Sequence, residues 1–99
     1  MSCSAYYIFF RNLANPLKMR IITELRKSSL SVNEITDNLK AEQSKVSHAL
    51  ANLKACNIVT CRSEGKQRIY SLNKKTIVPI FNIIDEHKAS YCKGGCCAK

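Results

Sequence analysis

Apolar residues recur at helical spacing through the first half of the chain. Residues 6–13 are apolar and aromatic, and they form either a first helix or a hydrophobic arm that needs covering. Residues 16–27 are predicted to be a helix because their apolar side chains fall on one side of it, at Leu17, Ile21, Ile22 and Leu25. Asn15 suits the N-cap of that helix, and Pro16 suits its first position.

Two further helices are predicted before the pattern changes. Ser31 and Glu34 have the spacing of a capping box, which predicts a short third helix. A fourth helix is predicted from about Gln43, with an apolar side formed by Val46, Leu50 and Leu53. Asn57 is a plausible end for this helix, since asparagine tolerates the left-handed conformation that often follows a helix.

Beyond residue 57 the period changes from helical to alternating. Residues 58–62 and 67–72 are predicted to be two strands of a hairpin around a turn at 63–66. A last helix is predicted over residues 76–91, with an apolar stripe at Ile77, Ile80, Phe81 and Ile84. Pro79 must lie in the first turn of that helix, because proline breaks a helix interior.

This order of elements predicts a mainly α fold with a β-hairpin wing, the winged helix-turn-helix (α-α-α-α-β-β-α). The 99 residues fit one small domain, and a core of that size is only marginally stable alone. We therefore expect either a dimer or a covalent staple, and the terminal helices are available to form a homodimer.

The charge of the chain is strongly positive. Its 16 Lys and Arg residues against 7 Asp and Glu give a formal net charge of +9, which indicates a polyanionic partner, either nucleic acid or an acidic membrane. A membrane is disfavoured because the basic residues do not line one face of an amphipathic helix. No apolar run approaches the roughly 18 residues of a membrane span. With no signal-peptide pattern at the N-terminus either, we expect a cytoplasmic protein without a membrane partner.

Basic and polar residues gather on the predicted fourth helix and the hairpin. Opposite the apolar side of that helix, Ser44 and His48 face outward, at the turn where a recognition helix contacts bases. Serine can bond base edges or phosphates, and Lys45 supplies charge for a phosphate. The residues predicted to bind double-stranded DNA are Gln43, Ser44, Lys45, Ser47, His48, Arg62, Lys66 and Arg68. The alternative is that the polar and basic residues of this helix and hairpin face water and bind no DNA.

Four segments resemble the ArsR/SmtB (arsenical-resistance repressor) family of metal-sensing regulators. They are LANPLKMRII at 13–22, QSKVSHALANL at 43–53, NIV at 57–59 and EGKQRIYSL at 64–72. The resemblance implies a homodimeric repressor of its own operon that leaves an imperfect palindrome when an inducer binds. The resemblance covers about residues 10–85. From the residues themselves we expect a DNA-binding and dimerisation domain over residues 1–91 and a cysteine-rich C-terminal tail over residues 92–99.

The chain departs from this family at two places. Glu42 stands where the family usually has Ser or Thr before the recognition helix, and it is a weaker cap although favourable to the helix dipole. The frequent Cys-Val-Cys pair of the third helix is absent, because residues 31–35 contain no thiol. The inducer must therefore bind elsewhere.

The strongest candidate inducer site is the tail, with Cys92, Cys96 and Cys97. The glycines at 94–95 permit a tight reversal, and neighbouring lysines favour the thiolate forms that bind soft ions. Three thiolates suit the pyramidal three-sulfur shell of As(III) or Sb(III), and some members of the family carry a similar tail. The alternatives are a redox repressor in which these thiols form disulfides, and a tail without a role.

Two weaker sites are also considered. Asp85 and His87 resemble half of the Zn²⁺ site that related sensors place on the last helix, but the other half is missing, and a packed or surface histidine is favoured. Zn²⁺ or another soft metal ion is thus an alternative inducer. Cys56 and Cys61 are interpreted as small apolar side chains, and Cys3 as a spare thiol.

Other function classes fit the sequence less well. We expect no enzyme, because the chain has no nucleophile–base pair with an orienting group and no glycine-rich phosphate loop. A soft-metal carrier is the remaining alternative of a different class. It would not need the polar recognition helix or the basic hairpin, so DNA binding that responds to salt distinguishes a repressor from a carrier.

Overall fold

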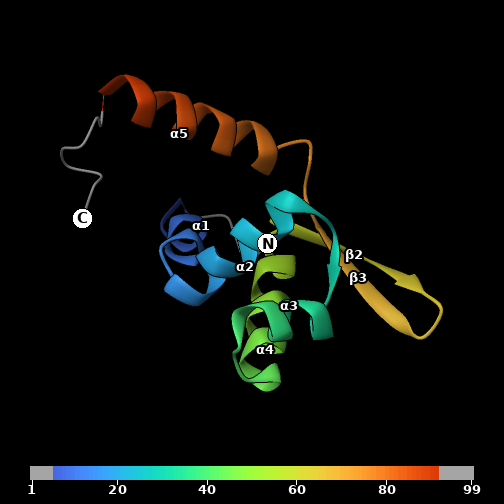
Figure 1. The fold of residues 1–99 in the computed structure, drawn as a ribbon. Coiled ribbons are helices and arrows are strands. Elements are labelled where there is room, and N and C mark those ends of the chain that lie inside the picture. Colours follow the sequence, from blue (N-terminus) through green and yellow to red (C-terminus); the bar gives the residue numbers. More distant parts are fainter. Residues whose placement is uncertain (1–5, 92–99) are drawn as a thin grey trace.

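The computed structural model describes residues 6–91. Its elements, in chain order, are α1 (Tyr6–Leu13), α2 (Pro16–Lys27), β1 (Leu30–Ser31), α3 (Val32–Leu39), α4 (Gln43–Ala55), β2 (Val59–Glu64), β3 (Gln67–Leu72) and α5 (Ile77–Tyr91). Helices α3 and α4 form the helix-turn-helix, and strands β2 and β3 project as the wing (Figure 1). The fold is the predicted winged helix-turn-helix, and residues 6–13 are a helix.

The predicted helix caps are present. Asn15 accepts a hydrogen bond at Oδ1 from the Lys18 backbone N–H at 3.0 Å, so its side chain caps α2. At α3, the Glu34 N–H donates to Ser31 Oγ at 3.2 Å, and the Ser31 N–H donates to Glu34 Oε1 at 2.9 Å. These two bonds complete the capping box and fix where the helix-turn-helix begins.

One strand was not predicted. Residues 30–31 form β1, which pairs antiparallel with β3 to give a sheet of order β1-β3-β2 among the described residues. A strand of two residues is too short to show an alternating pattern, so the sequence predicts only the start of a helix there. The second wing strand has the predicted bounds, whereas the first begins one residue later and ends two residues later than predicted, at Glu64. Glu64 pairs with Gln67 around a two-residue turn at Gly65, whose φ of +61° suits glycine.

The core is formed where α2, α3 and α4 pack against the base of the wing. Nine side chains there are almost completely buried: Ile21, Ile22, Ile35, Val46, Leu50, Leu53, Ile58, Val59 and Ile77. Three of them lie on α4, so the predicted apolar side of that helix is the one that packs inward. Burying each such side chain contributes about 1.5–3 kcal/mol, which fixes the rotation of α4 about its axis.

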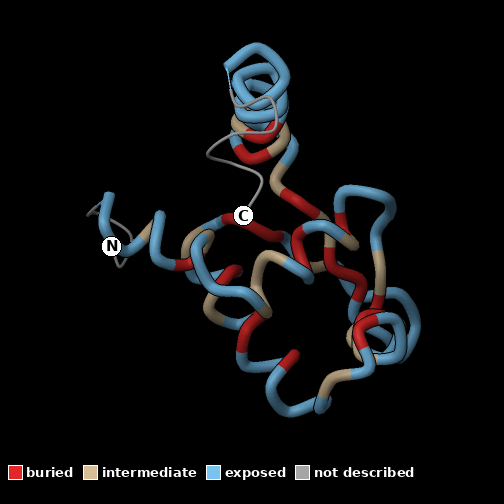
Figure 2. The backbone as a smooth tube through the Cα atoms, turned by 60° about the vertical axis from the view of Figure 1, so that its left-hand side comes forward, coloured by how far each residue is buried: buried red, intermediate tan, exposed pale blue. Residues whose placement is uncertain are grey.

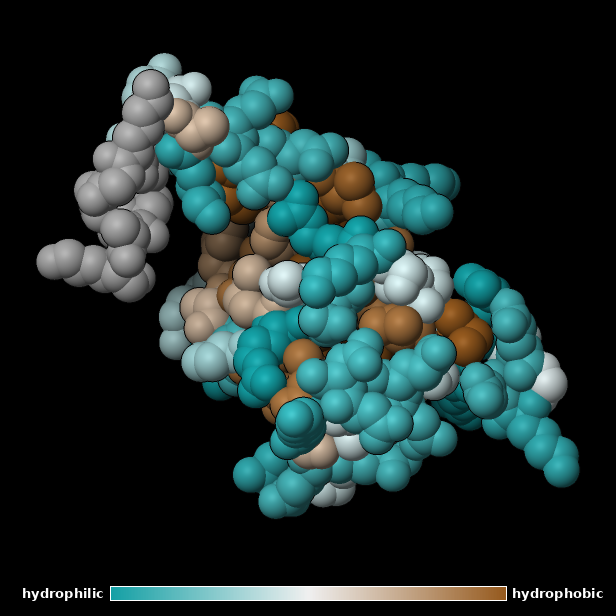
Figure 3. All heavy atoms as spheres, viewed as in Figure 1, coloured by the Kyte–Doolittle hydropathy of each residue, from teal (hydrophilic) through white to brown (hydrophobic). Residues whose placement is uncertain are grey.

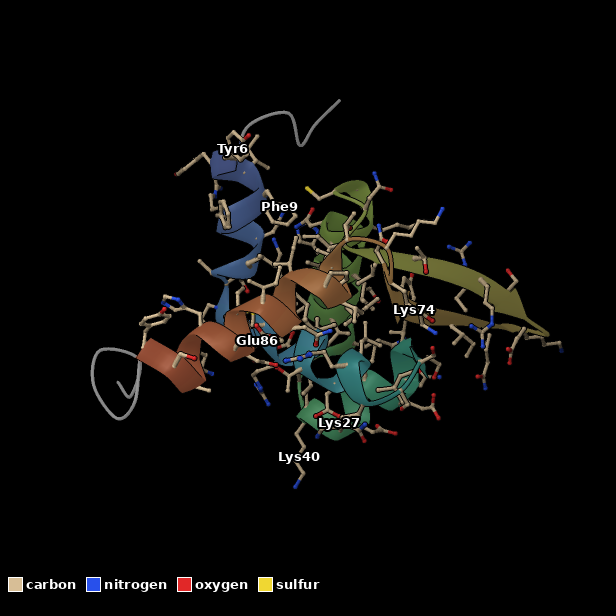
Figure 4. All side chains as sticks on the ribbon, turned by 90° about the horizontal axis from the view of Figure 1, so that it is seen from above. Tyr6, Phe9, Lys27, Lys40, Lys74 and Glu86 are labelled. Carbon is tan, nitrogen blue, oxygen red and sulfur yellow. The ribbon has the colours of Figure 1, made fainter. Side chains whose placement is uncertain are left out.

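The turn between α3 and α4 is held by a contact that sequence does not reveal. Lys40 ends α3 in the left-handed conformation, with φ of 53°, and its side chain extends away from the body (Figure 4). Arg20 of α2 donates through Nη2 to the Leu39 carbonyl at 2.8 Å. That bond satisfies one of the carbonyls that a helix end leaves without an intrahelical partner.

Helix α5 is attached to the body mainly by its first turns. Ile77 and Phe81 are buried, whereas residues 82–91 are exposed, as the burial colours show (Figure 2). Pro79 is the third residue of α5, where its missing N–H has no intrahelical acceptor to lose. None of the helices within residues 6–91 is long and apolar enough to cross a bilayer.

Candidate nucleic-acid interface

All the residues of α4 that were predicted to bind DNA lie on its exposed side. Val46, Leu50 and Leu53 are buried, and they hold the opposite side toward solvent. All five predicted residues of the helix are exposed: Gln43, Ser44, Lys45, Ser47 and His48. They occupy the first two turns, where a recognition helix meets base edges.

The N-terminus of α4 has no side-chain cap. Glu42, at the N-cap, makes no side-chain hydrogen bond to the first turn, as its weak capping propensity predicted. Its carboxylate instead lies 4.0 Å from the ammonium of Lys45, with both side chains about 70% exposed. The backbone N–H groups of the first turn are therefore without a side-chain acceptor and suited to a phosphate oxygen.

The wing contributes three cationic side chains, which differ in whether they form an ion pair. Arg62 is paired along its own strand with Glu64, at 3.0 Å from Nε and 2.9 Å from Nη2 to the same carboxylate oxygen. Both partners are more than half exposed, so this pair is weak and can be exchanged for a phosphate. Within residues 6–91, Lys66 and Arg68 form no ion pair.

A shallow hollow joins the wing to the helix-turn-helix. It has a volume of about 290 Å³ and lies between the N-termini of α3 and α4 and strand β3. Gln43, Lys66 and Arg68 line it together, so three predicted residues from separate elements meet there. Asn33 and Gln67 also line it, and neither is among the residues predicted to bind DNA. Both are uncharged and lie outside α4, so neither the charge pattern nor the exposed side of that helix selected them.

A second hollow runs along the other side of α4. Its volume is about 440 Å³, and Ser44, Lys45 and His48 line it with Asn15 and Lys18 from the start of α2. The predicted residues thus divide between two hollows flanking α4, while Ser47 and Arg62 line neither. Lys18 adds a cation beside this side of α4 and is not among the residues predicted to bind DNA.

The weaker metal candidates, Asp85 and His87, each contact another side chain of the described residues. Asp85 accepts a hydrogen bond from Arg26 at 2.7 Å, and that bond is the main cause that lowers the pKa of its carboxyl. His87 packs against Tyr91 with 5.1 Å between ring centroids. No group of three or more His, Cys, Asp or Glu residues within the described chain could hold a metal ion. The favoured interpretation of His87 as a packed surface histidine agrees with this geometry.

The cysteines fall into two groups. Cys92, Cys96 and Cys97, like Cys3, lie outside the described residues, so the tail site stays a prediction. Cys56 and Cys61 are half-buried against the core, and for Cys61 this agrees with the prediction of a small apolar side chain. Cys61 is a free thiol opposite Tyr70, whose pKa is raised first by burial and then by Cys61. Cys56 is disulfide-bonded, so its interpretation as a small apolar side chain was wrong.

Comparison with known proteins identifies relatives for most of the chain. Residues 15–60 match the family described as "Bacterial regulatory protein, arsR family". An uncharacterised HTH-type transcriptional regulator, MJ1325 of Methanocaldococcus jannaschii, is 32% identical over 78% of this chain and 88% of its own length. The HTH-type transcriptional repressor SmtB of Mycobacterium tuberculosis is 39% identical over 63% of this chain and 46% of its own.

A solved structure shares nearly the whole fold. It is the homodimeric winged helix-turn-helix DNA-binding domain of Mb0332 from Mycobacterium bovis, a possible ArsR-family regulator, with a TM-score of 0.80 and 97% of each chain covered. At 17% identity it supports the fold alone. The chain spans about half the length of the curated SmtB- and NmtR-type relatives that it matches.

Proposed function

The chain belongs to the ArsR/SmtB family of winged helix-turn-helix regulators, and on this premise we propose that it is a transcriptional repressor that binds operator DNA as a homodimer. The observation that carries the proposal is the meeting of Gln43, Lys66 and Arg68 in one hollow beside the exposed start of α4. A repressor of this kind works in the cytoplasm, where its operator lies.

The proposed roles follow from side-chain chemistry. Ser44, Ser47 and His48 on α4 contact base edges in the major groove, because hydroxyl and imidazole groups can both donate and accept. Lys45, Lys66 and Arg68 contact phosphates, which orient the protein without reading sequence. Arg62 joins them once a phosphate replaces Glu64 as its partner, and Gln43 bonds either a base edge or a phosphate.

The test of this proposal separates sequence recognition from charge. Fluorescence anisotropy at one fixed salt concentration would compare a duplex from the DNA upstream of the gene with a scrambled duplex of equal length. We expect the double variant Ser44→Ala, His48→Ala to lose most of the preference for the upstream duplex while still binding both. A matched control removes the same residue types from α5, as His87→Ala, Ser90→Ala. Equal preference in wild type and the α4 variant would overturn the proposed recognition helix.

The proposed dimer interface is formed by α1 and α5. Seven large apolar or aromatic side chains of these two helices are exposed: Tyr6, Tyr7, Ile8, Phe10, Ile83, Ile84 and Tyr91. Hydrophobic side chains also gather between α5 and the rest of the body (Figure 3). The apolar stripe of α5 continues beyond the body to Ile84, so burial of its far end requires a second copy.

We further propose that the inducer is As(III) or Sb(III), bound by Cys92, Cys96 and Cys97. The support is the donor set, because three thiolates are soft ligands that suit a pyramidal trivalent centre. The tail follows α5 directly, so coordination there would alter the end of a proposed dimer helix and change the spacing of the two recognition helices. A coupling of about 1–3 kcal/mol between the two sites is enough to release the operator.

The inducer test uses the upstream duplex and the reduced protein. Arsenite is titrated into complexes of the wild type and of the double variant Cys96→Ser, Cys97→Ser, with Cys61→Ser as a matched control outside the tail. We expect arsenite to release the wild type and the Cys61→Ser protein but not the double variant. Retention of all three proteins on DNA would contradict arsenite as inducer.

The alternatives predict different responses. Zn²⁺ release that Asp85→Asn abolishes would favour the α5 site, although Asp85 is paired with Arg26 and the described residues of one chain supply no third ligand. Release by oxidation, reversed by a thiol reductant, would favour a redox repressor. Metal binding without DNA binding that responds to salt would favour a soft-metal carrier.

A further inference from the structure

A pocket outside the proposed DNA interface lies between α1, the start of α2 and the last turn of α4. Its volume is about 620 Å³, within the range of about 300–1,000 Å³ that small-molecule sites occupy. The described polar residues that line it are Arg11, Asn12, Asn15, Lys18, Asn52 and Cys56. The other described lining residues are Ile8, Ala14, Pro16 and Ala55, which give the pocket an apolar side.

Among the described residues, the positive charge of this pocket has no compensating carboxylate. Two cations and no carboxylate of residues 6–91 line it, and neither Arg11 nor Lys18 has an ion-pair partner there. Arg11 lies over the ring of Tyr7, 5.7 Å from its centroid, which leaves the in-plane N–H donors of the guanidinium available. Burial and the neighbouring Arg11 lower the pKa of the Lys18 amine, as expected for an ammonium without a nearby anion.

The lysine is held in place by a chain of hydrogen bonds. Lys18 Nζ donates to Asn12 Oδ1 at 2.7 Å, and Asn12 Nδ2 donates to Cys56 Sγ at 3.1 Å. Asn12 is one of two buried polar side chains in the described chain, so this bond fixes the ammonium at the pocket wall. An ammonium has three N–H donors, and two remain for a ligand after the bond to Asn12.

We propose that this pocket binds a small phosphate monoester, whose dianionic group lies between Arg11 and Lys18. The amides of Asn15 and Asn52 can donate to the remaining phosphate oxygens, and the apolar side accommodates the organic part of the ester. Inorganic phosphate fills only part of a pocket of this volume. The ligand therefore bridges α1, α2 and α4.

The position of the pocket gives the ligand an effect on DNA binding, an effect that rests on the proposed function. Asn15, Lys18 and Asn52 line both this pocket and the hollow that contains Ser44, Lys45 and His48. A dianion at Lys18 places negative charge beside this second hollow, where we propose that Lys45 contacts a DNA phosphate. The ligand should therefore weaken operator binding, by about fivefold or more for an ordinary coupling between two sites.

Binding is tested first without DNA, so that it does not depend on the proposed function. Amide spectra of the full chain would be recorded during titration with phenyl phosphate, inorganic phosphate and benzoate, each at constant ionic strength. We expect saturable shifts at Asn12, Asn15 and Asn52 with phenyl phosphate, and weaker binding of the two partial ligands. Lys18→Met should weaken phenyl phosphate binding about tenfold or more, as expected for loss of a charge-assisted hydrogen bond.

Controls keep the result interpretable. Lys74→Met removes an exposed cation outside the pocket (Figure 4) and should bind phenyl phosphate like the wild type. If Lys18→Met does not fold, Asn52→Leu narrows the pocket while keeping both cations, and it should also lose binding. No saturable binding, or equal binding by all variants, would overturn the proposal. So would a Lys18→Met protein that loses only DNA affinity, because Lys18 would then be a DNA phosphate contact.

Discussion

Arg26 joins α2 to α5 through Asp85, with 2.7 Å between the guanidinium Nη2 and the carboxylate oxygen. The same guanidinium lies over the ring of Phe81, 5.3 Å from its centroid. These two contacts continue the attachment of α5 beyond its buried first turns. They link the proposed dimer helix to the body that carries the recognition helix.

The Arg26–Asp85 pair predicts a specific response to acid. The hydrogen bond from Arg26 lowers the pKa of the Asp85 carboxyl below its value in the unfolded chain. The pair therefore stabilises the fold fully when the pH is above that unfolded-state pKa. This contribution is lost as the pH falls through the lowered pKa. We expect Asp85→Asn to lower the urea midpoint at pH 7 and the difference from wild type to vanish in strong acid. Glu86→Gln, a neutralised neighbour, should show no such difference, and a deficit of Asp85→Asn that is independent of pH would contradict the assignment.

The exposed end of α5 predicts how the dimer can be broken. Ile83 is 66% exposed on the helix that we propose to pack across the dimer. Ile83→Glu should shift the protein to the 11.1 kDa monomer in sedimentation equilibrium, because a buried carboxylate without a partner is costly. The matched control Asn82→Glu adds the same charge at an exposed polar position and should remain dimeric. A dimeric Ile83→Glu protein would place the interface elsewhere.

Asn57 predicts a stability difference that depends on backbone conformation. Its φ of 57° lies in the left-handed region, between the end of α4 and the first wing strand. Asn57→Gly should be nearly neutral, whereas Asn57→Val should lose about 1–2 kcal/mol of unfolding free energy, the usual cost of that region for an L residue. Chemical denaturation measures both variants. Equal stability of the glycine and valine variants would show that the backbone is not constrained there.

Local signals were sufficient to predict most of the fold. Asn57 predicted the end of α4, and the capping box at Ser31 predicted the start of α3. Both signals could be recognised because each acts within four residues of its own position. The buried side of α4 could be predicted because an apolar stripe at helical spacing has one stable orientation against a core. The same reasoning identified the exposed residues at the start of that helix.

Contacts between distant segments could not be predicted in the same way. Asp85 is paired with a residue 59 positions earlier in the chain, so the sequence showed only a carboxylate near a histidine, a pattern shared with zinc ligands. The left-handed Lys40 carries no turn signature, since lysine has no preference for that conformation. The pocket containing Lys18 arises from three helices whose packing no local pattern specifies.

The most direct test of the central claim is the salt dependence of binding to the upstream duplex. For the folded wild type, log K should fall linearly with log salt concentration, with a slope of about −0.9 for each phosphate contacted. The variant Lys66→Gln, Arg68→Gln should bind more weakly with a slope reduced in magnitude by about 2, while Lys74→Gln should leave the slope unchanged. A folded protein that shows no salt-dependent DNA binding, or a wing variant with the slope of the wild type, would contradict the account.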